Sequence, residues 1–256
     1  MISPDYLNGL FSLAGKRALV TGASRGLGLA FSEALTSAGA HVVLAGRSEV
    51  PLLEAVERLR SDGADASHVV LDVTDTASVD DAVREAGAVD VLVNNAGIQQ
   101  RGPLEQFTDD DWRRIMSTNV DGVFRTSRAV VKGMIARGKG AIINVSSVQS
   151  LLARPSIGPY AAAKGAVGML TKSMAGEWGQ YGIRVNALAP GYFRTDLNAA
   201  LTTDADFSKW LSGRTPMRRW GEVKELAGAL VFLASDAGSF VTGQTLFVDG
   251  GITSVL

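Results

Sequence analysis

Short apolar runs alternate along the chain with longer segments in which apolar residues recur at helical spacing. Seven of these runs are predicted as strands: Arg17–Thr21, His41–Ala45, His68–Leu71, Val89–Val93, Ala141–Val145, Ile183–Leu188 and Gln244–Val248. Regular alternation of strands and helices is typical of a parallel sheet that is covered by helices on both faces. The pattern therefore predicts an α/β fold built on a doubly wound, seven-stranded parallel sheet.

The helical segments connect these strands and leave two regions outside the alternation. The helices are expected near Leu29–Leu35, Pro51–Arg60, Thr76–Glu85, Trp112–Ile135, Tyr160–Trp178 and Val223–Leu233. Residues 1–15 are expected to form an N-terminal arm whose Leu10–Leu13 segment packs on the rest of the protein. Residues 16–256 form one predicted domain, because no linker or charge block divides them. The irregular insertion near 196–215 is a candidate lid over a substrate pocket.

The composition excludes several kinds of chemistry. The 256 residues carry a net charge of −1 with acids and bases interspersed, which favours neither nucleic acid nor an anionic membrane as partner. The absence of cysteine excludes disulfides, thiolate catalysis and cysteine metal sites. The two histidines, His41 and His68, lie on predicted strands, so no metal site and no Ser-His-Asp triad is expected. Because the sequence shows no long apolar run and no signal-peptide pattern, a soluble cytoplasmic protein is expected.

A glycine-rich turn follows the first predicted strand and opens the first helix. It reads Gly22-x-x-x-Gly26-x-Gly28. In open parallel sheets, ligands bind beyond the carboxyl ends of the strands, where glycines allow a pyrophosphate to approach the backbone and a helix N-terminus. The spacing departs from Gly-x-Gly-x-x-Gly, so a turn without ligand is an alternative. The expected dinucleotide contacts in this turn are Gly22, Ser24, Arg25, Gly26, Leu27 and Gly28.

The end of the second strand bears on which dinucleotide binds. Proteins that bind a ribose 2′-hydroxyl usually carry an Asp or Glu about 20 residues beyond the glycines. Here Gly46 and Arg47 take that place, and Arg25 can approach the same point. Two guanidiniums without a carboxylate suit a 2′-phosphate, so NADP(H) is favoured over NAD(H). The alternative is that Arg47 stacks on adenine or faces solvent.

Polar residues after the third and fourth strands extend the expected dinucleotide site. Asp72, with Val73 beside it, is placed to accept a hydrogen bond from the adenine amino group, and helix capping by the Asp72–Asp75 turn is the alternative. The Asn94–Gly97 segment combines amides with small residues and can tie strand ends together as well as face a cofactor. Its expected cofactor contacts are Asn95, Ala96 and Gly97.

Ser147, Tyr160 and Lys164 are the strongest candidates for catalysis. Ser147 follows a predicted strand, and Tyr160 and Lys164 are four residues apart, so they share one face of a helix. A phenol has a pKa of about 10, which a fixed ammonium nearby lowers towards neutrality. Ser147 can then polarise a carbonyl while Tyr160 exchanges its proton. Taken alone, the Tyr-Lys pair is also compatible with a solvated helix face.

Together these motifs resemble those of the short-chain dehydrogenase/reductase family over nearly the whole chain. The matching residues are Thr21, Gly22, Gly26, Gly28, Asn94–Gly97, Asn119, Ser147, Tyr160, Lys164, Pro190, Gly191 and Thr195. The resemblance implies a Rossmann-type sheet, an NADP-dependent oxidoreductase that acts on a CH–OH group, and a homotetramer. The Phe247–Gly251 segment resembles one that lies at the interfaces of such tetramers.

The resemblance also implies individual roles. Tyr160 exchanges the proton, Lys164 lowers its pKa and binds the nicotinamide ribose, and Ser147 holds the carbonyl. Asn119 supports a water relay to Lys164. The contacts implied at the nicotinamide end are Tyr160, Lys164, Pro190, Gly191, Phe193 and Thr195.

A narrower resemblance is to family members that interconvert D-gluconate and 5-keto-D-gluconate. It is carried by Leu10–Lys16, Asn95–Gln99 with Arg101, Ser147–Ser150, Pro159–Ala162, Ala189–Phe193, Trp210–Leu211 with Arg214–Pro216, and Arg219–Gly221. A sugar acid needs a cation for its carboxylate, for which Arg101 is the first candidate and Arg154 the second. Gln149 is the candidate for a hydroxyl, beside Ser147 and Tyr160. Each of these is equally compatible with a surface or loop residue.

Other functions remain open from the sequence. A 3-oxoacyl-carrier-protein reductase shares every catalytic motif, and Arg128, Lys132 and Arg137 would offer its acidic carrier a basic surface. Another sugar or polyol dehydrogenase is compatible with the same motifs. A dinucleotide-sensing regulatory protein is the alternative that is not an enzyme, and the intact catalytic residues argue against it.

Overall fold

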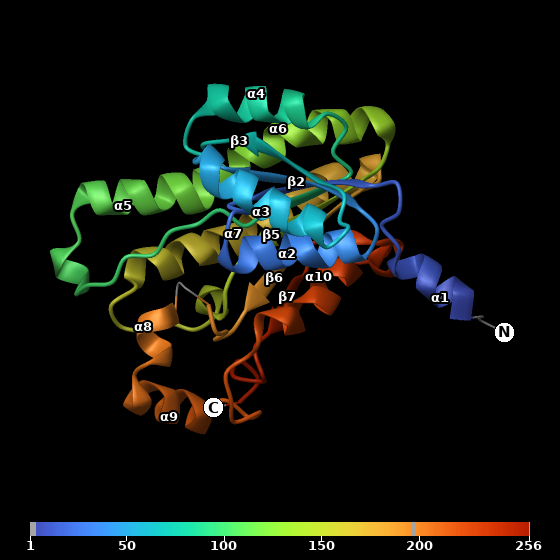
Figure 1. The fold of residues 1–256 in the computed structure, drawn as a ribbon. Helices are drawn as coiled ribbons and strands as arrows, with labels where there is room; N and C mark the ends of the chain where they lie inside the picture. The colour runs from blue at the N-terminus through green and yellow to red at the C-terminus, as the bar shows by residue number, and fades with distance from the viewer. Residues whose placement is uncertain (1–3, 196–197, 256) are drawn as a thin grey trace.

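The computed structural model describes residues 4–195 and 198–255, and it contains one parallel sheet in that part of the chain. The strand order is β3-β2-β1-β4-β5-β6-β7 (Figure 1), which confirms the Rossmann-type, doubly wound sheet of seven strands. The strands are β1 (Arg17–Thr21), β2 (His41–Gly46), β3 (Ala66–Val70), β4 (Val91–Asn94), β5 (Gly140–Val145), β6 (Ile183–Pro190) and β7 (Thr245–Val248).

The strand bounds differ from the expected ones where pairing, rather than local composition, decides them. β3 begins at Ala66, two residues before the predicted start, because Ala66 pairs with Val42 of β2. β4 begins at Val91 rather than Val89, and its pairing with Ala18 of β1 starts there. In both cases the neighbouring strand sets the start.

Helices cover both faces of the sheet. They are α1 (Pro4–Phe11), α2 (Gly26–Ser37), α3 (Glu49–Ser61), α4 (Thr76–Ala86), α5 (Asp109–Met116), α6 (Gly122–Arg137), α7 (Gly158–Trp178), α8 (Ala199–Thr202), α9 (Ala205–Arg214) and α10 (Ala227–Ala234). One core lies under α2, α3 and α10, and a second lies under α4, α6 and α7. Alternate residues of β1 serve the two cores, Val20 the first and Leu19 the second, as expected for a strand buried on both faces.

The single helix expected from Trp112 to Ile135 is more complex. It begins at Asp109, because Thr108 and Asp111 form a capping box, and it continues through a π-helical segment, η2 (Ser117–Asp121), into α6. A Cβ on Gly122 would lie 2.9 Å from Val73, so the helix approaches the loop after β3 closely at this point. The π-helical segment carries Asn119 into the interior.

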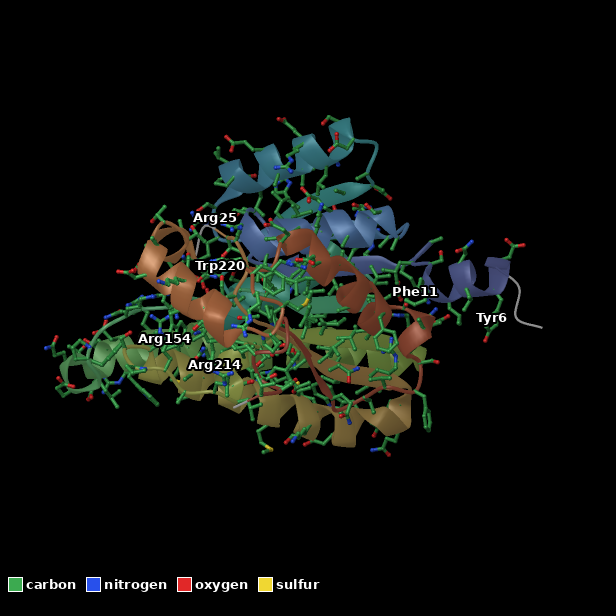
Figure 2. The ribbon with its side chains drawn as sticks, turned by 90° about the horizontal axis from the view of Figure 1, so that it is seen from below. Tyr6, Phe11, Arg25, Arg154, Arg214 and Trp220 are labelled. Carbon is green, nitrogen blue, oxygen red and sulfur yellow. The ribbon has the colours of Figure 1, made fainter. Side chains whose placement is uncertain are left out.

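The N-terminal arm packs less than expected. Of the Leu10–Leu13 segment, only Leu13 is buried, whereas Tyr6, Leu7 and Phe11 of the arm are exposed. Figure 2 shows Tyr6 and Phe11 towards one end of the molecule and Arg154 in its other half. Residues 1–3 of the predicted arm lie outside the described residues.

The candidate lid corresponds to α8 and α9, although its first two residues, 196 and 197, lie outside the described part of the chain. Asp204 caps α9 by accepting a hydrogen bond from the Phe207 amide at 2.9 Å. A third, small apolar cluster lies beneath the two helices and contains Val148, Leu201, Leu211, Trp220 and Ile252. No helix of the described residues is long and apolar enough to span a membrane.

Candidate active site

A cleft of about 1110 Å³ opens at the carboxyl ends of the strands, where the strand order reverses between β1 and β4. Every residue expected to contact cofactor or substrate lines this cleft, with Asn119 as the exception among the site residues. The cleft also contains Ile98, Gln99, Tyr192 and Asn198, which sequence reasoning did not assign. In open α/β sheets, such a switch point is where ligands bind.

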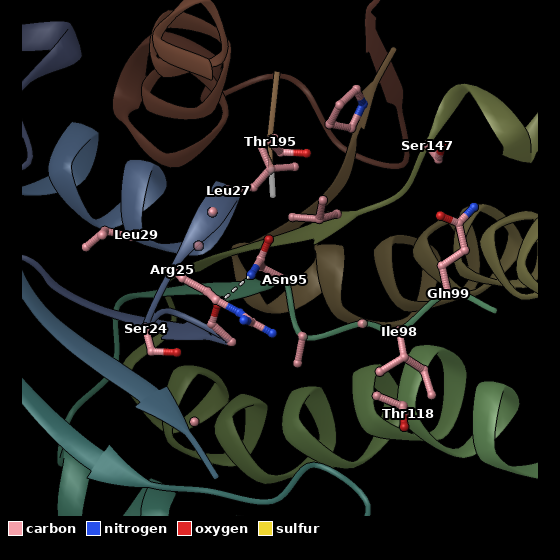
Figure 3. A pocket seen from close by; sticks show the side chains of 18 of the residues that line it. Ser24, Arg25, Leu27, Leu29, Asn95, Ile98, Gln99, Thr118, Ser147 and Thr195 are labelled. Carbon is pink, nitrogen blue, oxygen red and sulfur yellow. Dashed lines mark hydrogen bonds between the residues drawn. The ribbon is translucent and has the colours of Figure 1, made fainter. Parts of the chain in front are cut away.

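The glycine turn is locked to the neighbouring strand. The Asn95 side chain donates to the carbonyls of Thr21 at 2.9 Å and Gly22 at 3.0 Å. The Thr21 hydroxyl accepts in return from the amides of Asn95 and Ala96, both at 3.0 Å. Figure 3 shows the Asn95 side chain with one of its hydrogen bonds as a dashed line. The expected structural role of the Asn94–Gly97 segment is thus visible in its hydrogen bonds.

Glycine is required in the turn for two reasons. Gly22 and Gly26 have φ values of +64° and +57°, in the left-handed region that side chains disfavour. A Cβ on Gly28 would lie 2.1 Å from the Gly22 carbonyl oxygen, so α2 can only start this close to β1 with glycine at that position. No atom lies within 4 Å of a Cβ built on Gly26, which leaves the backbone open to the cleft. The turn therefore fits a pyrophosphate at the N-terminus of α2.

Arg25 and Arg47 are both exposed on the wall of the cleft, and neither forms an ion pair with a described residue. Asp72 lines the same side of the cleft, and the charge of Arg47 reaches its carboxyl. Burial raises the pKa of the Asp72 carboxyl, but hydrogen bonds from Thr74 and the charges of Arg47 and Arg125 lower it overall. The two guanidiniums thus remain available for a phosphate.

In the turn after β3, the residue that caps α4 differs from the residue that faces the cleft. Asp72 Oδ1 accepts from the amide and the hydroxyl of Thr74, at 2.8 and 2.7 Å. Asp75, rather than Asp72, caps α4 by accepting from the Ala77 amide at 2.9 Å. Asp72 faces the cleft and remains a candidate for the adenine contact.

The catalytic candidates converge from β5 and α7. Ser147 ends the loop after β5 and is 8% exposed. Lys164 is 5% exposed, and its ammonium donates to the Val145 carbonyl at 2.7 Å and lies 5.6 Å from the centre of the Tyr160 ring. The fold thus brings residues of a strand end and a helix to one point of the cleft.

The expected lowering of the Tyr160 pKa by Lys164 stays a prediction, because burial dominates the net shift of that pKa in this structure. Burial raises the pKa of Tyr160, a hydrogen bond with Ser147 lowers it, and Tyr192 raises it further, with a net increase. The Tyr160 ring is partly exposed to the cleft, but protein atoms surround it densely enough for desolvation to dominate. Burial also lowers the pKa of Lys164 to about 8.

Asn119 lies behind the cleft rather than on its wall. Its side-chain oxygen accepts from the Ile98 amide, and its side-chain nitrogen donates to the Ile98 carbonyl, both at 2.8 Å. A Cβ on Gly97 would lie 3.0 Å from Asn119 Oδ1 and 3.8 Å from Lys164 Nζ, so the two side chains approach the same point. Asn119 therefore fixes the segment after β4, and its part in a water relay stays a prediction.

The substrate candidates form a cationic end of the cleft. Burial lowers the pKa of Arg101, and the nearby charge of Arg154 lowers it further. The Arg154 guanidinium lies 4.6 Å from the centre of the Phe207 ring on α9. Within the described part of the chain, neither arginine forms an ion pair, and the carboxylates that line the cleft, Glu54 and Asp72, lie on the β2–β3 side. Two neighbouring cations without an acid form a site for an anion.

Gln149 is held beside this cationic end. Its backbone amide donates to the Ser147 hydroxyl at 3.2 Å, and its side-chain nitrogen donates to the Tyr192 hydroxyl at 3.3 Å. Its side-chain oxygen is buried and has no partner among the described residues. Tyr192 was missed as a site residue, although a Tyr directly after the Pro190-Gly191 turn at a strand end was the available signal.

Comparison with known proteins gives matches over nearly the full length. A family model described as enoyl-(acyl carrier protein) reductase matches residues 22–253. The chain is 55% identical to a gluconate 5-dehydrogenase of Gluconobacter oxydans, with 99% of each chain covered. It is 45% identical to a 5-keto-D-gluconate 5-reductase of Escherichia coli, with 96% of this chain and 98% of the relative covered.

A solved structure is similarly close. It is that of a gluconate 5-dehydrogenase from Burkholderia cenocepacia in complex with NADP and tartrate. It has a TM-score of 0.95 and 55% identity, and the match covers 98% of this chain and all of the other.

Proposed function

The chain belongs to the short-chain dehydrogenase/reductase family, and we propose that it interconverts D-gluconate and 5-keto-D-gluconate with NADP(H). It is an oxidoreductase of CH–OH groups, and sugar-acid relatives of 55% and 45% identity support this substrate. The observation that carries the proposal is that Arg101 and Arg154 lie near each other beside the catalytic candidates and form no ion pair with a described residue. A sugar acid brings a carboxylate for the pair and a ketone for Tyr160.

The protein's own residues supply the proton and orient the substrate carbonyl. In reduction, Ser147 donates a hydrogen bond to the C5 carbonyl oxygen, and Tyr160 transfers its proton to that oxygen. Lys164, held by the Val145 carbonyl, places a positive charge beside the phenolate that remains. A bound nicotinamide dinucleotide supplies the hydride that adds to C5, or accepts it in the reverse direction.

NADP is the cofactor that fits the residues of the cleft. The open glycine turn would hold the pyrophosphate, and Arg25 and Arg47 would bind the 2′-phosphate. The Burkholderia relative contains NADP, which supports the same choice for this chain. Thr195, Pro190 and Gly191 line the other end of the cleft, where the nicotinamide would lie.

Three expectations stay predictions. The chain is expected to be a single catalytic domain with a lid, to assemble as a homotetramer, and to act in the cytoplasm. The first rests on the uninterrupted strand-helix alternation, the second on the family resemblance, and the third on the sequence pattern.

The test follows reduced-nicotinamide absorbance with 5-keto-D-gluconate, with NADPH and NADH in parallel. We expect rapid oxidation of NADPH and a much slower reaction with NADH. Tyr160→Phe is expected to lower kcat about 10²- to 10⁴-fold, because the proton donor is lost, whereas the matched surface change Tyr181→Phe keeps the rate. Turnover of acetoacetyl thioesters without turnover of 5-keto-D-gluconate would instead assign the chain to carrier-protein reduction. No turnover on any carbonyl, with NADPH still bound, would favour a sensor.

A further inference from the structure

The Gln149 side chain lines the cleft, and only one of its two polar atoms has a hydrogen-bond partner among the described residues. Its nitrogen donates to the Tyr192 hydroxyl, while its oxygen is buried without a partner in the described residues. Leaving a buried acceptor unpaired costs about 1–3 kcal/mol. A hydroxyl of a bound ligand would remove this cost, and the oxygen belongs to a residue that lines the substrate end of the cleft.

Tyr192 holds this amide from a rigid position. It directly follows the Pro190-Gly191 turn at the end of β6. Its ring packs against Phe207 at 5.7 Å and edge-on against Trp220 at 5.9 Å between centroids. These aromatic contacts fix the ring, so the hydroxyl that accepts from Gln149 is fixed as well.

Tyr192 lines the same cleft as the catalytic and cationic candidates, and it lies within electrostatic reach of both Tyr160 and Arg101. Gln149 is in turn tied through its backbone amide to Ser147, the residue expected to hold the reacting carbonyl. The Gln149 side chain thus extends from a backbone held at Ser147 to the Tyr192 hydroxyl.

We infer that Tyr192 is a positioning residue that orients the Gln149 amide, so that its oxygen accepts a hydrogen bond from a substrate hydroxyl near the reacting carbon. The inference rests on the proposed function, and it adds the group by which the enzyme distinguishes a hydroxylated keto acid from a plain one. A site built to bond a hydroxyl discriminates strongly against analogues that lack it, because its polar group then stays unpaired.

The experiment compares two six-carbon keto acids. 5-Keto-D-gluconate carries hydroxyls on its chain, and 5-oxohexanoate has the same carboxylate and the same C5 ketone without them. We measure kcat/KM for both with NADPH in the wild type, Tyr192→Phe, Gln149→Met and the double variant. The matched controls are Tyr181→Phe and Gln180→Met, because both residues are exposed and lie outside the cleft. NADPH binding to each variant, followed by fluorescence, verifies that its fold is intact.

The expected result is a fall of about tenfold in the ratio of the two kcat/KM values for each single variant, as for the loss of one hydrogen bond. The double variant should fall no further, since Tyr192 acts through Gln149. An unchanged ratio, or losses that multiply in the double variant, would overturn the inference. If the wild type reduced 5-oxohexanoate as well as 5-keto-D-gluconate, the inference would fail while the proposed reaction stood. If it reduced only 5-oxohexanoate, both would fail.

Discussion

At the scale of single residues, burial outweighs charge in setting the protonation of the catalytic pair. The Tyr160 pKa is raised and the Lys164 pKa is lowered to about 8, and desolvation is the main cause of both shifts. Tyr160 thus keeps its proton near neutrality and is ready to donate it to a ketone. Lys164 is the group of this pair that titrates in the working range.

The lowered pKa of Lys164 predicts how ketone reduction depends on pH. A Lys164 whose pKa is about 8 is charged below that pH and neutral above it. We therefore expect kcat/KM for NADPH, which reports on the free enzyme, to be constant below pH 7 and to fall as the pH rises through about 8. The measurement is initial rate at limiting NADPH between pH 6 and 10.

Two variants identify the group responsible. In Lys164→Arg the guanidinium stays charged, so the fall near pH 8 should disappear, even if the overall rate is lower. In the matched change Lys172→Arg, on the exposed side of α7, the fall should remain. A fall near pH 8 that persists in Lys164→Arg would contradict the assignment.

At the scale of elements, side-chain amides tie the carboxyl ends of the strands into a fixed rim. Asn94 at the end of β4 donates to Asn144 of β5 at 2.8 Å and to Ser127 of α6 at 2.9 Å. Asn144 donates in turn to Thr171 of α7 at 2.9 Å. Because all four side chains are buried, these bonds hold α7, and with it Tyr160 and Lys164, against the sheet.

Because α2 approaches β1 closely, a side chain at Gly28 is expected to affect both stability and NADPH binding. In Gly28→Ala, the new Cβ would lie 2.1 Å from the Gly22 carbonyl oxygen, so the glycine turn must move. Overpacking of this kind costs about 1–3 kcal/mol, or a Tm lower by about 2–12 °C for a chain of this size. We expect this loss by calorimetry, together with a KM for NADPH raised at least about tenfold.

The matched control is Gly176→Ala in α7. No atom lies within 4 Å of a Cβ at that position, and alanine is favoured over glycine in a helix by up to about 1 kcal/mol. Its Tm should be unchanged or higher. An unaltered KM for NADPH in Gly28→Ala would show that the turn does not approach the cofactor.

At the scale of the whole molecule, one edge of the sheet is incompletely covered. β7 forms one edge, and all four of its residues are only half-buried although three of them are apolar. The neighbouring C-terminal region exposes further apolar side chains, Phe240 and Val255 among them. An apolar edge strand that stays open is prone to association, so proteins usually cover it.

This edge supports the expected homotetramer. We predict that the protein in solution has a mass four times the 26.8 kDa of one chain, measured by light scattering after size exclusion. Burying β7 and the exposed apolar residues beside it would provide the driving force. A mass of a single chain at micromolar concentration would contradict both the assembly and this interpretation of β7.

Much of the fold and of the cofactor site was determined by the sequence alone. Strand burial on two faces requires continuous apolar runs, and a pyrophosphate turn requires glycines, so both signals lie within a few neighbouring residues. The doubly wound parallel sheet and the glycine turn at its carboxyl edge followed from them, whereas the strand order came from the structure. The starts of β3 and β4 were misplaced by two residues each, because the neighbouring strand sets them.

Only the tertiary structure decided how the site's polar groups behave. It placed Asn119 behind the cleft and Tyr192 at its substrate end, left the Gln149 oxygen without a partner among the described residues, and made burial the main influence on the Tyr160 pKa. Desolvation and hydrogen bonding depend on atoms that are distant in sequence, as Gln149 and Tyr192 are 43 residues apart. Local pattern thus determines which residues reach the cleft, and packing determines what each of them does there.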